Sequence, residues 1–157
     1  MLPAKAQGPT DYSVHANIVY RFTKYIDWTP AKKTGDFVIG VVGESPLVDK
    51  LKQITANKKV GEQKIVVKAV PAAEVDNGYH IVYVPEEESD QFRKILARTA
   101  GQPILIVTES EGFGGRGSCI NFNLEEEHLK LEINKNAIEN RRLKIATELL
   151  ALGKIIQ

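Results

Sequence analysis

Apolar residues recur at helical spacing between Asp11 and Asp27, near the start of the chain. The positions are Val14, Ile18, Phe22 and Ile26, with Val19 and Tyr25 beside them. This spacing predicts an amphipathic helix with one buried face. Pro30 and Gly35 are expected to end it.

Four later segments are predominantly apolar and of strand length, at residues 37–42, 64–70, 79–84 and 103–108. Runs of this kind are typical of strands that are buried on both faces. Helical segments are predicted between them, one starting after Ser45-Pro46 and one after Pro85. Strands that alternate with helices favour a parallel sheet with right-handed crossovers.

The pattern changes to strict alternation over residues 118–124 and 128–134. This predicts an antiparallel hairpin, with Glu125-Glu126-Glu127 as its turn. Ile120, Phe122 and Leu124 are expected to face the core, and Cys119, Asn121 and Asn123 to form a polar face. From Asn134 to Ile156 the apolar positions predict a closing helix.

Together these segments predict an α/β fold in three layers, with a mostly parallel central sheet, an antiparallel C-terminal hairpin and flanking helices. No linker or internal repeat divides the chain, so residues 11–157 are expected to form one domain. Residues 1–10 contain Ala4-Lys5-Ala6, which has the small-x-small form of a signal-peptidase site. They are either the remnant of a signal peptide, cleaved close to Ala6, or a disordered N-terminus.

Composition and charge exclude several partner classes. The 157 residues carry 21 basic and 20 acidic side chains, a formal net charge of +1, which gives no reason to expect nucleic acid or an anionic membrane as partner. No apolar run approaches the roughly 20 residues that span a bilayer, so the chain is not expected to be membrane-spanning. The single cysteine, Cys119, cannot form an internal disulfide.

The segment from Gly112 to Gly117 satisfies the G-x-G-x-x-G pattern and follows a strand. Dinucleotide binding requires the glycines to open a helix, whereas here another strand is predicted to follow. The segment is therefore expected to be a flexible connection with positive φ angles. An alternative is that Arg116 and the loop amides hold a small anion.

No combination of residues points to catalysis. Cys119, Ser45 and Ser118 are the candidate nucleophiles and His15, His80 and His128 the candidate bases, but none lies in a known catalytic signature. The histidines and cysteine also lack the spacing of a metal site. The protein is therefore not expected to be an enzyme. No catalytic residue, metal or cofactor is expected.

Four residues are instead candidates for binding a partner or ligand. Ser45 lies at the carboxyl end of a predicted parallel strand, where it can cap a helix or contact a ligand. Trp28 ends the first helix and belongs either to the core or to a contact surface. Phe113 and Arg116 lie in the glycine-rich loop, where large side chains often supply binding energy.

Four blocks of sequence, taken in order, resemble the YfiR-like family of periplasmic regulatory proteins. They are YRFTKYIDW (20–28), IGVVGESPL (39–47), PILIVTESEGFGGRGSCINFNL (103–124), and LKLEIN (129–134) with LKIATELL (143–150). The resemblance extends over nearly the whole chain, from Val14 to Ile156. Relatives carry cysteine pairs that can form disulfides, whereas this chain has Cys119 alone.

The resemblance implies an exported, periplasmic protein that regulates by binding, because the family's namesake represses a membrane-bound diguanylate cyclase of cyclic di-GMP signalling. The implied partner is the periplasmic part of a membrane signalling protein, either a diguanylate cyclase or a sensor kinase. A homodimer is the other assembly considered. A small-ligand-binding sensor domain is the alternative function.

Overall fold

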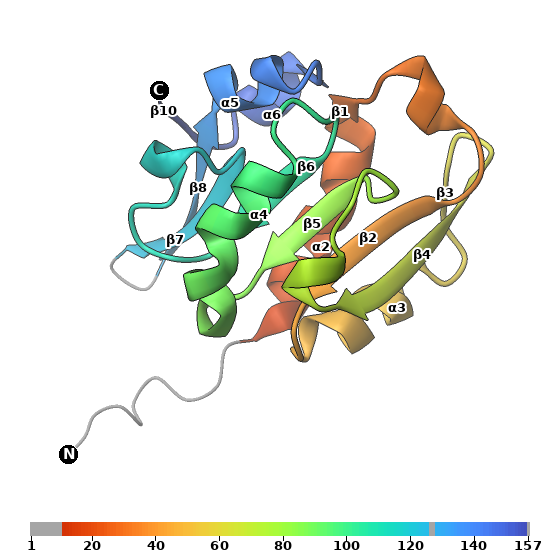
Figure 1. Cartoon of the computed structure of the whole chain (residues 1–157), viewed down its shortest axis with the longest axis horizontal. Helices are drawn as coiled ribbons and strands as arrows, with labels where there is room; N and C mark the ends of the chain where they lie inside the picture. Colours follow the sequence, from red (N-terminus) through yellow and green to blue (C-terminus); the bar gives the residue numbers. More distant parts are fainter. Residues whose placement is uncertain (1–10, 126–127, 157) are drawn as a thin grey trace.

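A central mixed sheet organises the protein, as the computed structural model shows for residues 11–125 and 128–156 (Figure 1). Within those residues the sheet has eight strands in the spatial order β10-β8-β7-β6-β5-β2-β4-β3. Their bounds are β2 Phe37–Val42, β3 Lys59–Val60, β4 Gln63–Val70, β5 Ile81–Val84, β6 Leu105–Thr108, β7 Ile120–Glu125, β8 His128–Asn134 and β10 Lys154–Ile156.

The five neighbouring strands β4, β2, β5, β6 and β7 run parallel. β8 returns antiparallel to β7. β10 then pairs parallel to β8, and β3 antiparallel to the start of β4. The expected fold, a mostly parallel sheet with a C-terminal antiparallel hairpin, is confirmed. The expected hairpin turn at residues 125–127 falls largely on residues 126–127, which lie outside the described residues.

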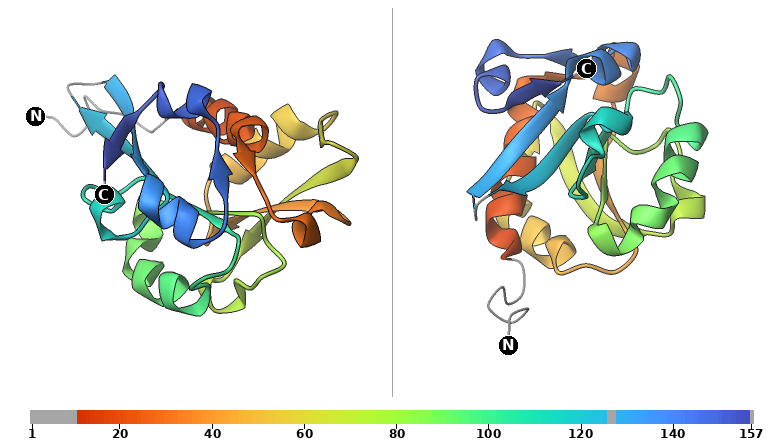
Figure 2. Two further views of the ribbon diagram at one scale, coloured as in Figure 1. Left: turned by 90° about the horizontal axis from the view of Figure 1, so that it is seen from above. Right: turned by 90° about the vertical axis from the view of Figure 1, so that its left-hand side faces the viewer.

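Helices cover both faces of the sheet, which makes three layers (Figure 2). α2 (Tyr12–Tyr25) and α3 (Leu47–Thr55) pack together on one face, and α4 (Phe92–Arg98) lies on the other. The Asp11 side chain caps α2 by accepting a hydrogen bond from the Ser13 amide at 2.9 Å. Val14, expected in the buried stripe, is 50% exposed, because the buried face of α2 is centred on His15, Ala16, Val19 and Phe22.

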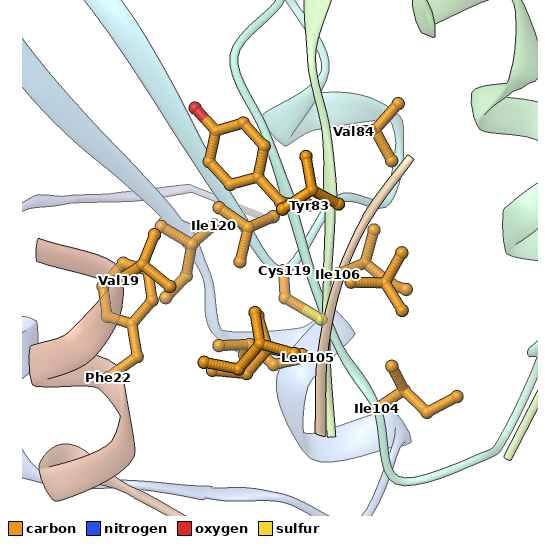
Figure 3. Close-up of a cluster of buried hydrophobic side chains, with 14 of the residues drawn as sticks. Val19, Phe22, Tyr83, Val84, Ile104, Leu105, Ile106, Cys119 and Ile120 are labelled. Carbon is orange, nitrogen blue, oxygen red and sulfur yellow. The ribbon is translucent and has the colours of Figure 1, made fainter. Parts of the chain in front are cut away.

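The core lies between α2 and the middle strands (Figure 3). Every residue of β5 and β6 is buried, which explains their continuous apolar sequence. Val19 and Phe22 of α2 face Ile120 and Leu105 of the sheet. Helix and sheet therefore bury their apolar surfaces against each other.

The polar face of the β7–β8 hairpin is buried at Cys119 and Asn121, whereas Asn123 farther along the strand is partly exposed. Cys119 and Asn121 are 0% exposed. The Thr108 hydroxyl donates to Asn121 Oδ1 at 2.6 Å, and Asn121 Nδ2 donates to Glu132 Oε1 at 2.9 Å. The glycine-rich segment covers this face, where Asn134 Nδ2 donates to the Gly114 carbonyl at 2.9 Å.

Leu124 was expected to face the core but is 69% exposed. It lies near the end of the hairpin, opposite Leu129 and next to the last pair of residues, Glu125 and His128. The alternation of faces along β7 was predicted correctly. The elements that pack on the face of Ile120 and Phe122 do not extend as far as Leu124.

The predicted closing helix from Asn134 to Ile156 is wrong. The segment consists of α5 (Lys135–Asn140), β9 (Lys144–Ile145), α6 (Thr147–Leu150) and β10. Arg142 adopts a left-handed conformation with φ 62°, which ends helical geometry after α5. β9 then pairs with β1 (Ile26–Asp27), and β10 pairs with β8.

Buried polar contacts also hold this segment in place. The Arg141 guanidinium donates to the Thr99 carbonyl at 3.0 Å and to the Thr99 hydroxyl at 3.2 Å. Thr99 follows the last turn of α4, where a cation interacts favourably with the helix dipole. These tertiary contacts override the helical periodicity of the sequence.

We predict that Gly153→Ala destabilises the protein by about 1–3 kcal/mol, because an added Cβ would lie 2.8 Å from the Leu131 carbonyl oxygen and 2.8 Å from Ile133 Cδ1. Urea unfolding measures the free-energy change. Gly115→Ala is the control, since a Cβ there meets no atom within 4 Å. Equal stability of the two variants would contradict the close approach of Gly153 to β8.

Candidate functional site

The loops after β2, β5 and β6 meet at the carboxyl edge of the parallel sheet. The chain leaves β2 toward β4 on one side and then crosses to β5 on the other, so the β2–β5 boundary is a topological switch point. Open α/β sheets tend to bind ligands at this place. Ser45 lies here, and its hydroxyl accepts a hydrogen bond from the Leu47 amide at 3.2 Å, at the start of α3.

Glu109, which directly follows β6, joins the elements around this edge. Its carboxylate accepts hydrogen bonds from the Tyr83 hydroxyl at 2.6 Å, the Tyr12 hydroxyl at 2.9 Å and the Glu86 amide at 2.8 Å. Burial, and then the Glu109 charge, raise the pKa of both phenols above their ordinary value. Both tyrosines therefore stay neutral donors, and the cluster anchors α2 to the sheet.

A groove runs between α4 and the glycine-rich loop, and it brings two predicted contact residues together. The Phe113 ring stacks on Phe92 with centroids 4.4 Å apart and an interplanar angle of 20°. The Arg116 guanidinium lies 5.7 Å from the Phe113 centroid, in a cation–π arrangement. The groove encloses about 910 Å³ and is also lined by Arg93 and Leu96.

The arginines of this groove are exposed, and neither has an ion-pair partner in the described part of the chain. Arginine on an aromatic surface is typical of sites that bind other proteins. Phe92 and Arg93 were missed from the sequence because they lie within a predicted helix, where nothing marks the side that faces the loop. The groove can thus take up an aromatic or acidic group.

Close contacts hold the loop against β8, while its expected flexibility stays a prediction. Gly112 and Gly117 have positive φ angles of 83° and 112°, as predicted, but Gly114 is required for another reason. A Cβ on Gly114 would contact Ile156 Cδ1 and lie 3.1 Å from Glu132 Oε1. The amides of Arg116 and Ser118 both donate to the Phe113 carbonyl, so they are not free to hold an anion.

Trp28 lies at the other end of β2 from Ser45, so the structure does not bring these two residues together. It is 5% exposed, its indole N–H donates to the His80 carbonyl at 3.1 Å, and its ring packs edge-on against Phe37 at 4.9 Å. Trp28 is therefore a core residue, the first of the two alternatives. It also lines a cleft of about 600 Å³ beside the β3–β4 hairpin and β9. A contact between Trp28 and a partner stays a prediction.

A buried lysine next to Trp28 was not expected from the sequence. Lys32 donates to the carbonyls of Asn77 and Tyr79, and burial lowers its pKa to about 8. The Lys32 carbonyl in turn accepts from His80 Nε2 at 2.6 Å, while His80 Nδ1 accepts from the Val38 amide at 3.2 Å. Nothing in the sequence distinguishes Lys32 from Lys33, which is exposed and paired with Asp27 at 2.7 Å.

The candidate groups for catalysis lie apart. His15 is on α2, His80 precedes β5, and His128 begins β8. Burial raises the pKa of the Cys119 thiol, which disfavours the reactive thiolate. The described residues contain no group of three or more potential metal ligands, and no described helix is long and apolar enough to span a membrane.

We predict that Trp28→Ala lowers the free energy of unfolding by about 3–5 kcal/mol, because it empties a filled part of the core. Chemical denaturation measures the loss. Tyr25→Ala serves for comparison and should cost less, since Tyr25 is only partly buried. A Trp28→Ala protein as stable as the wild type would contradict the burial of this ring.

We predict that stability falls as the pH drops below about 6.5, the ordinary histidine pKa. Burial lowers the pKa of His15 and His80 in the folded protein, so the unfolded chain binds more protons in this range and acid favours unfolding. Melting temperatures between pH 7.5 and 5 measure the effect. His15→Phe should reduce this slope, because Phe keeps the stacking on Phe122 without titrating.

His128→Gln is the control for this pH series, since His128 is exposed on β8. The His128→Gln protein should keep the wild-type slope. An unchanged slope in His15→Phe would show that His15 does not contribute to acid sensitivity.

Comparison with known proteins assigns the chain to a family. The family model described as YfiR/HmsC-like matches residues 12–154, which include every regular element of the sheet except the end of β10. No curated protein matches the chain. The matched range contains the Glu109 cluster, the groove at Phe113 and the core around Trp28. On this match, the chain belongs to the YfiR/HmsC-like family.

Proposed function

We propose that this protein is a periplasmic regulator that acts by binding the periplasmic part of a membrane signalling protein, either a diguanylate cyclase or a sensor kinase. The observation that carries the proposal is the family match over residues 12–154, since the family includes a repressor of a diguanylate cyclase. The proposal includes export, with the precursor cleaved close to Ala6, and one functional domain from residue 11 onward.

The geometry of the molecule supports a binding role over a catalytic one. In the polar cluster at Glu109, the carboxylate oxygens are occupied by three donors from the protein itself. The candidate nucleophile Cys119 is fully buried. Neither place combines an accessible nucleophile with a base, which acyl or phosphoryl transfer would need.

The groove between α4 and the glycine-rich loop is the proposed contact region. The stacked Phe92 and Phe113 are largely buried beneath it, at 2% and 9% exposure, and Arg93 and Arg116 supply exposed positive charge beside Asp90. Aromatic and arginine side chains carry much of the energy of protein interfaces. The complementary surface on the partner is therefore acidic, with an apolar or aromatic group at its centre.

A second candidate function, a small-ligand sensor, is favoured by the cleft beside Trp28. Its volume of about 600 Å³ lies in the range of ligand sites, and its wall combines Trp28 and Ile145 with polar side chains such as Gln63. A ligand there would contact both the β1–β9 pair and the β3–β4 hairpin. Saturable binding of a small molecule that is lost on changing Ile145 to Arg would support this function.

We predict that Arg93→Glu/Arg116→Glu weakens binding to the partner by about 2 kcal/mol or more, because two exposed cations of the groove become anions. The measurement uses the purified periplasmic domain of each membrane diguanylate cyclase and sensor kinase from the native host, with binding isotherms for each. Cellular cyclic di-GMP is the second measurement and should rise when the cyclase is released.

Arg21→Glu/Lys24→Glu is the matched control, because it makes the same charge change on the exposed side of α2. This control should bind as the wild type does. Equal weakening by both double variants would show that the groove is not the contact region. Failure of every periplasmic domain to bind the wild-type protein would contradict the proposed function.

A further inference from the structure

The edge of the sheet at β4 is open along most of its length. β4 has eight residues, and β2 pairs with it from Ile65 to Val70 on one side. On the other side β3 pairs only with Gln63 and Lys64. Figure 1 shows β4 at the margin of the sheet, with β3 beside one end of it.

The direction of the β4 backbone identifies the groups that face outward. The Val70 carbonyl accepts from the Gly43 amide, so it points toward β2. The main-chain N–H and C=O groups of successive residues alternate in direction along a strand. Those of Val66 and Lys68 therefore also point toward β2, whereas those of Ile65, Val67 and Ala69 point outward. Within the described residues these three have no main-chain partner on the outer side. They form a ladder that an extended chain can complete.

Three exposed lysines flank this ladder, Lys64 and Lys68 on β4 itself and Lys59 on β3. Between residues 50 and 70 there are six lysines and one acidic residue, Glu62. The described ion pairs involve none of the six. Lys59 lies directly opposite Lys64 across the β3–β4 pair, an arrangement of like charges that is unfavourable without an anion nearby. The lysines of β3 and β4 therefore give this edge an excess of positive charge, although the chain as a whole has a net charge of only +1.

The two faces of β4 specify the pattern of side chains that an added strand would carry. Lys64 and Lys68 are exposed on the face that Tyr79 shares, with Lys68 Nζ 5.6 Å from the Tyr79 ring centroid. Ile65 and Val67 are buried on the opposite face, at 8% and 6% exposure. A strand with acidic residues at every second position and apolar residues between them matches both faces.

A second copy of this chain is a poor occupant of the same edge. Antiparallel pairing of two β4 strands centred on Val66 places Lys64 of each copy opposite Lys68 of the other. Pairing centred on Val67 leaves the two Lys68 residues diagonally adjacent. Lysine on an edge strand discourages self-association in this way, and the same charges attract an acidic chain.

We propose that the open edge of β4 binds an extended acidic segment of another protein, which adds to the sheet as a ninth strand. This surface is separate from the groove at Phe113, because β2, β5 and β6 lie between β4 and the loop that follows β6. The proposal does not depend on the regulatory function of the groove.

The test uses a blocked twelve-residue peptide with glutamate at every second position and valine or threonine between. Binding should protect the amides of Ile65, Val67 and Ala69 from hydrogen exchange, measured by NMR on the intact protein. Lys64→Glu/Lys68→Glu should weaken binding at least about tenfold, because attraction at two cross-strand positions becomes repulsion. Val67→Pro keeps the charges, removes one outward N–H group and should also weaken binding.

The matched control is Lys130→Glu/Lys154→Glu, which makes the same charge change on β8 and β10 at the other end of the sheet. It should bind as the wild type does, and melting curves confirm that each variant is folded. Equal weakening by both double variants, binding without protection of the three amides, or no binding would overturn the proposal. Protection of the same amides by self-association alone would assign the edge to a second copy.

Discussion

Strands β5 and β6 are buried on both faces, and this constraint governs the rest of the structure. A parallel sheet of such strands is stable only when both of its faces are covered. α2 and α3 cover one face, and α4 covers the other. Where the helices end, over β7 and β8, the glycine-rich loop takes over the cover of the second face. The loop is therefore part of the core's boundary, and its position fixes the groove beside α4.

Buried and half-buried polar groups attach the covering elements to the sheet at defined places. Glu109 holds the first turn of α2 through Tyr12, and Arg141 holds the C-terminal segment to the end of α4. Lys32 joins the turn after β1 to the segment before β5. Each of these charges accepts or donates several hydrogen bonds, which offsets the cost of burying it. These hydrogen bonds also fix the positions of α2, of the C-terminal segment and of the turn after β1 relative to the sheet.

The two proposed interaction surfaces differ in the physics of recognition. The groove at Phe113 offers side chains, an aromatic floor with arginines, and would recognise a shaped and acidic surface. The β4 edge offers main-chain groups flanked by lysines and would recognise an extended segment. A regulator that has both can hold a folded domain and a linker at once, which raises the effective concentration of each contact.

The sequence by itself determined the α/β class, the parallel strands and the hairpin, because their hydrophobic periods are local and unambiguous. It also placed Phe113 and Arg116 in a loop and Ser45 after a parallel strand, where it could cap a helix or contact a ligand. Only the tertiary structure decided the rest. Asn121 is buried because a loop folds over its face. Trp28 is in the core, where its ring packs against Phe37 and its N–H group donates to the His80 carbonyl. Residues 135–156 follow a helical pattern, but β10 pairs with β8 and Arg141 contacts Thr99. These contacts join residues distant in sequence, so no local pattern could show them.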